Sequence, residues 1–257
     1  MHMADALLTP AVAGVMYAAS AVVAGASIVE LHKEEKQDLT STGKKLPTMA
    51  VMSALVFAGQ MINYTIPGTG SSGHLCGGLL LTSVLGPWAG FLSMIVILTI
   101  QSLFFADGGL MALGANVWNM AFYGCFVGYF LIYRPLMRSR CFARRGERAA
   151  NRLKITLASV LGCVLTLQLG AFSVVLETTL SGITDLPFGA FCAIMQPIHL
   201  AIGLIEGLIT AAVLLFLYEA RPELLRDVCT GGETAGKVSF KGTIAVIALA
   251  AVLVGGG

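Results

Sequence analysis

The sequence predicts an all-α fold: a polytopic membrane helix bundle of about seven transmembrane helices, with its amino terminus outside the cell. Three observations support this prediction. Hydrophobic residues make up 56% of the 257 positions and charged residues only 12%, whereas a soluble domain averages about 25% charged residues. Apolar runs long enough to span a bilayer recur along the chain. Basic residues gather in two of the segments between these runs.

Six apolar runs are long enough to cross a membrane as helices, which takes about 20 residues. They lie at 10–29, 47–65, 88–105, 109–133, 154–178 and 189–218. A shorter run at 75–86 leads into Gly86-Pro87-Trp88, and we expect it to form either a short crossing or a re-entrant dip. We favour the crossing, which gives seven in all.

Basic residues orient the helices, because Lys and Arg concentrate in cytoplasmic loops. Loop 134–154 holds eight basic residues against one acidic residue, and segment 30–46 holds four lysines. Placing both in the cytoplasm puts residues 1–9, 66–74 and 106–109 outside. The outer face then carries acidic side chains and no basic ones, a charge pattern that attracts cations.

The first two residues form a compact metal chelator. The α-amine of Met1, the deprotonated amide nitrogen of His2 and the His2 imidazole can all reach one ion and fill three corners of a square. His74 ends a glycine-rich loop on the same outer face and is our candidate for the fourth corner. Four nitrogens in a square suit Ni(II) or Cu(II), and less strictly Co(II). Because residues 1–9 lack the basic region of a secretion signal, we expect Met1 to be the mature amino terminus.

Polar side chains in and beside the predicted helices are candidates for orienting or gating the metal, since buried polar groups in a membrane need partners. These candidates are Asp5, Gln101, Asn116, Asn119 and His199. The amides near the turn at 107–109 can support the metal-binding imidazoles or simply bond one helix to another. His199 and Glu206 share one helical face, too deep in the membrane for a surface chelate.

A stripe of small residues runs along the helix predicted at 47–65. Ala50, Ala54 and Ala58 repeat at a spacing of four, which lets helices approach closely in lipid, either within this chain or as a docking face for another membrane subunit. Towards the carboxyl end the sequence predicts three domains. They are a membrane domain at 1–225, a cytoplasmic linker at 226–241, and the start of a further transmembrane segment at 242–257, cut off at Gly257.

Four segments resemble the NikM/CbiM family, the substrate-binding membrane subunits (S-components) of energy-coupling-factor transporters for nickel and cobalt. They are Met-His-Met-Ala-Asp at 1–5, Ser-Gly-His-Leu-Cys-Gly-Gly-Leu at 72–79, Leu-Gly-Pro-Trp-Ala-Gly at 85–90, and the stretch from Ala106 to Met120 that contains both asparagines. The resemblance covers most of 1–225. It implies that the metal is held by the Met1 amine, the His2 amide and imidazole, and His74. The family's usual glycine after the first aspartate is Ala6 here.

The resemblance also implies partners and a location. The family delivers Ni(II) or Co(II), as transported substrate, through a transmembrane coupling subunit and two cytoplasmic ATPase subunits. A small companion membrane subunit is sometimes fused at the carboxyl end, and we expect the run after 242 to begin such a fusion, which favours nickel over cobalt. We therefore expect a multi-pass protein of the inner cell membrane with an external, periplasmic metal site, no enzymatic activity, no catalytic cofactor and no nucleic-acid partner.

Two other functions compete with this interpretation. One is a stand-alone, proton-coupled divalent metal transporter that uses His199 and Glu206. The other is a membrane metalloenzyme, which the lack of an H-E-x-x-H motif argues against. The chain has no G-x-x-x-x-G-K-[ST] phosphate loop, so any ATP hydrolysis must come from partners. Its six cysteines form no C-x-x-C pair, which argues against a zinc ribbon or a disulfide framework.

Overall fold

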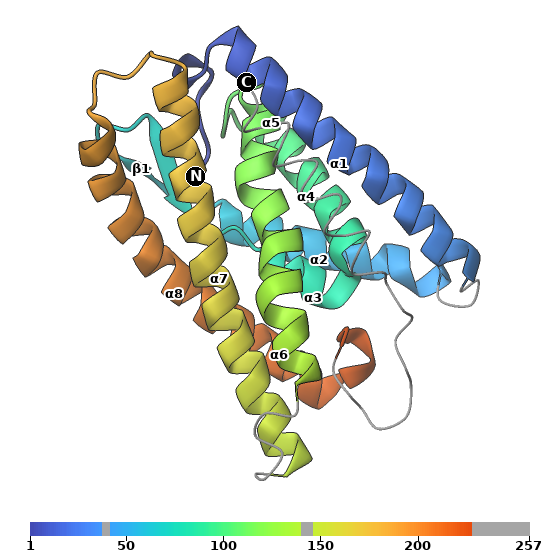
Figure 1. Cartoon of the computed structure of the whole chain (residues 1–257). Coiled ribbons are helices and arrows are strands. Elements are labelled where there is room, and N and C mark those ends of the chain that lie inside the picture. Colours follow the sequence, from blue (N-terminus) through green and yellow to red (C-terminus); the bar gives the residue numbers. More distant parts are fainter. Residues whose placement is uncertain (38–41, 140–145, 228–257) are drawn as a thin grey trace.

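A computed structural model of the chain describes residues 1–37, 42–139 and 146–227 (Figure 1). Within these residues five helices are long and apolar enough to cross a membrane. They are Pro10–Glu34, Pro87–Phe104, Leu113–Arg138, Glu147–Ser181 and Phe188–Ala220. A shorter apolar helix covers Leu46–Gln60. The expectation of an all-α, multi-pass membrane bundle is confirmed, and the number of seven crossings stays a prediction.

The elements follow one another in this order: η1 (Asp5–Leu7), α1 (Pro10–Gln37), α2 (Thr42–Gln60), β1 (Asn63–Ile66), β2 (Ser71–His74), α3 (Gly78–Leu85), α4 (Pro87–Phe104), α5 (Leu113–Asn116), η2 (Val117–Tyr133), α6 (Arg134–Arg138), α7 (Glu147–Leu180), α8 (Phe188–Ala220) and η4 (Pro222–Leu224). Elements α5, η2 and α6 follow without a break as one long helix, whose middle part, η2, is π-helical. Figure 1 shows α2 running across the direction of the longer helices.

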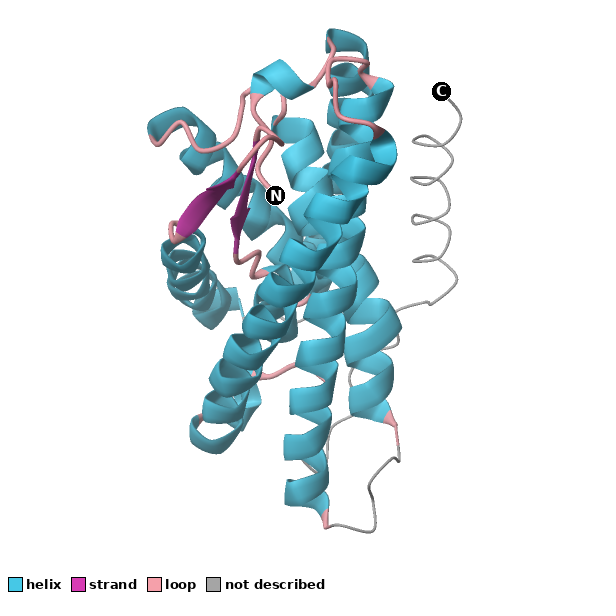
Figure 2. Cartoon of the chain, turned by 90° about the vertical axis from the view of Figure 1, so that its left-hand side faces the viewer, coloured by secondary structure: helices cyan, strands magenta, loops and turns pink. Residues whose placement is uncertain are grey.

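The hairpin β1–β2 was not predicted from the sequence. Helix α2 ends at Gln60 rather than at 65, and the next residues pair in antiparallel register, with Asn63 opposite His74 and Ile66 opposite Ser71. The local sequence explains this change. Tyr64, Thr65 and Ile66 favour strands, and the Pro-Gly pair at 67–68 favours a turn. His74 is therefore the last residue of a strand that lies among helices (Figure 2).

Helix α3 is the short element predicted after His74. All eight of its residues are buried, and it packs against α4 and η2. At 1.5 Å per residue it is only about 12 Å long, well short of a bilayer core. Gly86 has a φ of +88°, which favours glycine, and Pro87 begins α4 at the first helical position, where proline is tolerated. The turn at 86–88 is thus confirmed as the break between two helices.

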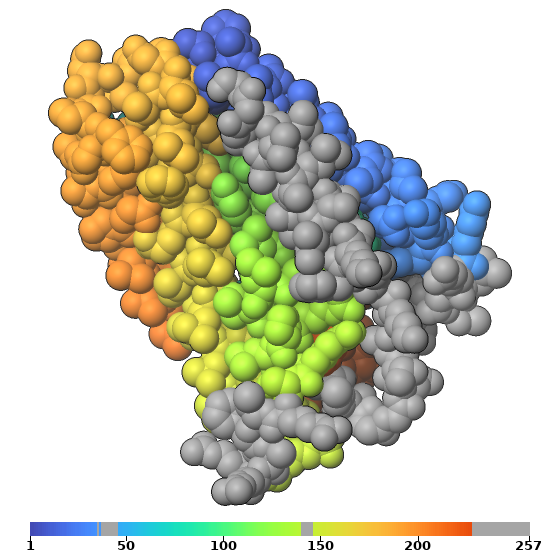
Figure 3. Space-filling model, in the orientation of Figure 1, coloured from blue at the N-terminus to red at the C-terminus, as the bar shows by residue number. Residues whose placement is uncertain are grey.

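Helices α7 and α8 pack closely along their length, and their side chains form a continuous surface in Figure 3. Gly203 and Gly207, one turn apart on α8, make this approach possible. A Cβ atom on Gly203 would lie 2.9 Å from the Cα atom of Val164, and one on Gly207 would lie 2.6 Å from the Cα atom of Val160. Small residues at such spacing are typical of helix contacts in membranes.

The segment after α8 returns beneath the bundle. Asp227 accepts hydrogen bonds from Nε and Nη2 of Arg138, at 2.8 and 2.5 Å, and Arg226 lies 3.3 Å from Glu34 of α1. These contacts tie residues 221–227 to α6 and α1. The rest of the predicted linker at 226–241 and the run at 242–257 lie outside the described residues. The small-residue stripe is on the described surface, since Ala50, Ala54 and Ala58 are all exposed on α2.

We predict that Gly207→Ala lowers the melting temperature of the protein in detergent. The added methyl group meets the backbone of α7, so the two helices must separate, which typically costs about 1–3 kcal/mol. Gly14→Ala is the matched control, because no atom of the described residues lies within 4 Å of its Cβ position and alanine is the better helix former. An equal melting temperature for the two variants would contradict the packing described for α7 and α8.

Candidate metal centre

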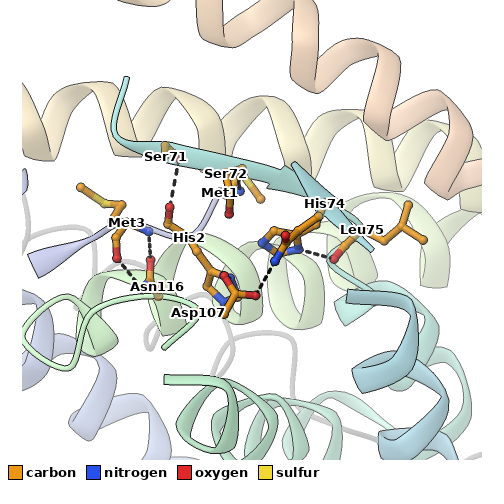
Figure 4. Close-up of polar contacts among 10 residues, drawn as sticks. Met1, His2, Met3, Ser71, Ser72, His74, Leu75, Asp107 and Asn116 are labelled. Carbon is orange, nitrogen blue, oxygen red and sulfur yellow. Dashed lines mark hydrogen bonds and ion pairs between the residues drawn. The ribbon is translucent and has the colours of Figure 1, made fainter. Parts of the chain in front are cut away.

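The amino-terminal segment enters the bundle and adds to the β hairpin. Met1 and Met3 are fully buried and His2 is 3% exposed. The Met1 amine donates a hydrogen bond to the carbonyl of Ser72, and the Ser72 N–H donates to the His2 carbonyl at 3.2 Å. Met3 forms an antiparallel bridge with Ser71 (Figure 4). Residues 1–3 thus lie beside β2 like a short third strand, which brings His2 next to His74.

The opposite side of the amino-terminal segment is held by the turn between α4 and α5 and by the end of α5. The side chain of Asn116 binds both backbone groups of Met3, accepting its N–H at 2.8 Å and donating to its carbonyl at 3.2 Å. The Gly109 N–H donates to the same carbonyl at 2.9 Å. Asp5 accepts a hydrogen bond from the Ala112 N–H at 3.1 Å. Asn116 and Asp5 therefore fix the backbone of the amino terminus rather than the imidazoles.

The two imidazoles lie against each other with ring centroids 4.5 Å apart. His74 Nδ1 bonds the Leu75 carbonyl at 2.7 Å, and His2 Nδ1 bonds Oδ1 of Asp107 at 3.0 Å. Because both partners are acceptors, Nδ1 carries the proton in each ring and Nε2 carries the lone pair. Both Nε2 atoms are buried and have no hydrogen-bond partner among the described residues. For His74 this is the arrangement of an imidazole prepared to bind a metal, with one ring nitrogen bonded to a backbone carbonyl and the other free.

The burial of the site favours uncharged nitrogens. Burial lowers the pKa of the Met1 amine to about 6. Burial also lowers the pKa of His2, and it lowers the pKa of His74 well below the usual value, with a further contribution from the nearby amine. Near neutral pH these three groups therefore hold free lone pairs.

Asp107 keeps a negative charge beside His2. Its partial burial by itself would raise the pKa of the carboxyl group, but hydrogen bonds from His2 and Asn63 outweigh that effect and lower it. The Asn63 side chain donates to Oδ2 of Asp107 at 2.7 Å. A chelate ring that contains the His2 amide nitrogen can close only through Nδ1 of the same residue. Asp107 therefore competes with an ion for this atom.

The main chain is essential to any metal site here. Among the described residues, no three His, Cys, Asp or Glu side chains lie close enough together to hold a metal ion. Two imidazoles thus need the amine and the amide nitrogen of the amino terminus to complete a set of four. In the described part of the chain the His2 N–H has no hydrogen-bond acceptor, so this nitrogen is not engaged elsewhere.

A cavity of about 460 Å³ lies beside this group of nitrogens. Its lining residues include His2, Ser71 and Ser72 of β2, Asp5 and Asp107. In the part of the chain described, the two aspartates are the only charged residues of this lining. Asp5 is exposed at its rim. The cavity therefore offers an acidic approach from the surface to His2, in agreement with the predicted attraction of cations.

The remaining predicted residues have other hydrogen-bond partners or none. Asn119 donates to Met3 Sδ at 3.7 Å and to Oε2 of Glu177 at 2.8 Å. The side-chain amide of Gln101 has no partner among the described residues. His199 is fully buried, and its Nδ1 donates to the Met195 carbonyl at 2.8 Å. Among the described residues, none of these three side chains forms a hydrogen bond with the amine or with either of the two imidazoles.

The role of Asp107 was not predicted from the sequence, in which this residue is only one of the acidic side chains of the outer face. In the structure it bonds the ring nitrogen of His2 that a chelate would use. The contacts of Ser72 were not predicted either: its carbonyl group binds the amine and its N–H binds the His2 carbonyl. Backbone groups leave no trace in the sequence, so this contact was not predictable from residue types.

Residues 2–224 match the sequence model of the family described as the cobalt uptake substrate-specific transmembrane region. The chain belongs to this family. A putative fused nickel transport protein from Archaeoglobus fulgidus is 39% identical over 237 residues, which cover 91% of this chain and 71% of that protein. A probable fused nickel transport protein from Lactiplantibacillus plantarum is 32% identical, covering 90% and 68%. A cobalt transport protein from Sorangium cellulosum is 33% identical, covering 70% and 76%.

Solved structures agree with this assignment. A crystal structure described as a truncated transition metal transporter has a TM-score of 0.72 and is 31% identical, covering 86% of this chain and 99% of that one. A second, described as a transition metal transporter, has a TM-score of 0.71 at the same identity, covering 86% and 93%. The resemblance inferred from the four sequence segments is thus confirmed, and the relatives are named as metal transport proteins rather than enzymes.

We predict that Asn116→Leu weakens metal binding by about 10–100-fold, the usual cost of losing a residue that orients a metal site. Leucine has a similar volume but cannot form hydrogen bonds with the Met3 backbone, so the amino-terminal segment loses both bonds that Asn116 makes to it. Isothermal titration with Ni(II) measures the effect. Asn151→Leu is the matched control, since Asn151 is a buried asparagine that bonds Tyr218 on α8, away from the amino terminus. Equal losses in both variants would contradict the assignment.

Proposed function

We propose that this protein captures Ni(II) or Co(II) at the external face of the membrane. In this proposal the ion is bound by the Met1 amine, the His2 amide nitrogen, the His2 imidazole and the His74 imidazole. The observation that carries the proposal is the convergence of the buried Met1 amine, the His2 imidazole and the His74 imidazole, whose Nε2 has no hydrogen-bond partner among the described residues; His2 and His74 are 72 positions apart in the sequence. Four nitrogens in a square favour Ni(II), and the names of several relatives support either nickel or cobalt as the transported substrate.

Capture begins in the acidic cavity. The ion enters past Asp5 and Asp107 and loses its water as it reaches the imidazoles. The His2 ring then turns from Asp107 to the ion, so that Nδ1 closes the chelate. The protons of Nδ1 and of the His2 amide are released, together with any proton on the amine. His74 supplies the fourth nitrogen through Nε2, while its Nδ1 stays bonded to the Leu75 carbonyl.

Delivery of the ion requires partners. We propose that this chain is the substrate-binding subunit of an energy-coupling-factor transporter, with a transmembrane coupling subunit and two cytoplasmic ATPase subunits. Release follows when this assembly distorts the square of nitrogens. The fused nickel transport relatives support a companion subunit joined at the carboxyl end. The exposed alanine stripe at Ala50, Ala54 and Ala58 remains the proposed docking face for another membrane subunit.

The alternative function is a stand-alone, proton-coupled transporter that uses His199 and Glu206. The hydrogen bonds of Glu206 argue against it. Its two carboxyl oxygens accept the N–H groups of Cys76 and Gly77, at 2.6 and 2.9 Å. A carboxylate that anchors a turn in this way is poorly placed to carry protons through a transport cycle.

We predict that one extra residue ahead of Met1 abolishes high-affinity Ni(II) binding. The addition moves the amine away from the His2 amide nitrogen and leaves every side chain unchanged. Isothermal titration of the purified protein with and without the extra residue measures the effect. Unchanged binding would contradict the chelate and move the site inward, toward His199 and Glu206.

His2→Ala and His74→Ala are each expected to weaken Ni(II) binding by more than about 100-fold, because each removes a ligand rather than a supporting residue. His199→Ala should keep most of the affinity. His32→Ala is the matched histidine control, since His32 is exposed on α1 far from the amino terminus in sequence. Tight binding by the His2→Ala protein would overturn the proposed site.

Purified protein in lipid vesicles separates the two transport mechanisms. Without ATPase partners we expect no accumulation of Ni(II) driven by a pH gradient. Accumulation that is lost in the Glu206→Gln protein would favour the stand-alone transporter instead.

A further inference from the structure

A single peptide group connects His74 to the buried carboxylate of Glu206. The carbonyl of Leu75 accepts the Nδ1–H of His74 at 2.7 Å, and the N–H of Cys76 donates to Oε2 of Glu206 at 2.6 Å. This carbonyl and this N–H belong to the same peptide unit. Because the unit is planar and trans, its N–H and C=O point in opposite directions. Glu206 therefore holds the peptide from one side while His74 bonds it from the other.

The turn that contains this peptide is fixed by further contacts. Oε1 of Glu206 accepts the Gly77 N–H at 2.9 Å, and Nε2 of Gln60 donates to the Cys76 carbonyl at 2.5 Å. Gly77 has a φ of +73°, and a Cβ atom there would lie 2.6 Å from a methyl carbon of Val56. Glu206 and Gln60 are both buried. The turn between β2 and α3 thus has one conformation, held from α8 and from α2.

We propose that Glu206 is a positioning residue for the metal ligand His74, acting through the Leu75–Cys76 peptide. This inference rests on the proposed function, in which His74 binds the ion through Nε2. The carboxylate aligns the peptide and so fixes the direction of the Leu75 carbonyl. That carbonyl in turn holds the His74 ring with Nε2 facing the amino terminus.

The same contacts strengthen His74 as an electron donor. A carboxylate bonded to a peptide N–H polarises the group and increases the negative charge on its carbonyl oxygen, since hydrogen bonds in a chain reinforce one another. A stronger bond from Nδ1–H to that oxygen raises the basicity of Nε2, as a carboxylate does when it bonds a metal-binding histidine directly. His74 is bonded to a carboxylate through one intervening peptide, and the bond is made by Nδ1, which leaves Nε2 for the ion.

The first test is Glu206→Gln in the purified, full chain. Glutamine has almost the same size, but its single oxygen can accept only one of the two N–H groups, and its NH₂ group faces the other. We expect Ni(II) affinity to fall by about 10–100-fold, the usual cost of removing a partner of a metal-binding histidine. We also expect the visible absorption band of the bound Ni(II) to move to longer wavelength, because a weaker nitrogen donor produces a smaller ligand field.

Leu214→Val is the matched control. Leu214 is fully buried on α8 about two turns after Glu206 and, as an apolar side chain, forms no hydrogen bond with the turn at 75–77. It should keep both the affinity and the absorption band. If Glu206→Gln gives unchanged affinity and an unchanged band, the proposal is wrong. If Leu214→Val shows the same losses, general packing of α8 explains them and the proposal is also wrong.

A double-mutant cycle separates positioning from a general structural role. In protein that already carries His74→Ala, we expect Glu206→Gln to cause no further loss of affinity, since its path to the metal is gone. The residual binding by the other three nitrogens is measured at high Ni(II) concentration. Additive losses would overturn the proposal. If His74→Ala alone leaves the affinity unchanged, the proposed metal site itself is wrong rather than the role of Glu206.

If the Glu206→Gln protein does not fold, the Glu206→Asp protein tests the proposal instead. Aspartate keeps the charge but is one methylene shorter, so it reaches at most one of the two N–H groups. The expected loss of affinity is smaller than for glutamine, with the absorption band displaced in the same direction. Wild-type affinity and an unchanged band in the Glu206→Asp protein would overturn the proposal.

Discussion

The burial of the chain's own amino terminus governs the arrangement of the site. An amine that is taken out of water must find a hydrogen-bond acceptor or lose its charge, since an isolated buried cation is very costly. Here it donates to the Ser72 carbonyl, and burial lowers its pKa to about 6. An uncharged amine is also a good metal ligand. Burial of the amine is therefore costly, but the loss of charge that it favours also leaves the amine nitrogen with a free lone pair for an ion.

Two unrelated parts of the chain accept the buried terminus. The hairpin strand β2 binds it as a neighbouring strand would, through backbone groups of Ser71 and Ser72. The turn between α4 and α5 holds it through Gly109, and α5 holds it through Asn116; both residues bond the Met3 carbonyl. Each of these partners satisfies backbone groups that would otherwise be left unpaired in a buried place. A displacement of either element would therefore change the position of His2.

The two imidazoles are held in different ways. His74 is bonded to the backbone of its own turn, which α8 anchors through Glu206, so its Nε2 is free while its ring is fixed. His2 is bonded to the partly buried Asp107, and the nitrogen involved is the one that a chelate with the His2 amide needs. The His74 ring is thus held in place, whereas the His2 ring can exchange Asp107 for another partner. This difference suits a site that must take up an ion and later give it away.

The sequence by itself determined the class of the protein and the approximate positions of the helices, with both ends close to the structure only for α4 and α8. Composition, apolar runs and the loop charges predicted the membrane bundle, and the positions of Met1, His2 and His74 led to the proposed metal site. Only the tertiary structure decided what holds them, because Asp107, Asn116 and Glu206 lie 105, 113 and 130 positions from their partners. Two of these contacts involve backbone groups, which every residue carries. No periodicity or motif marks such a contact, so it emerges only when the packed helices bring the two segments together.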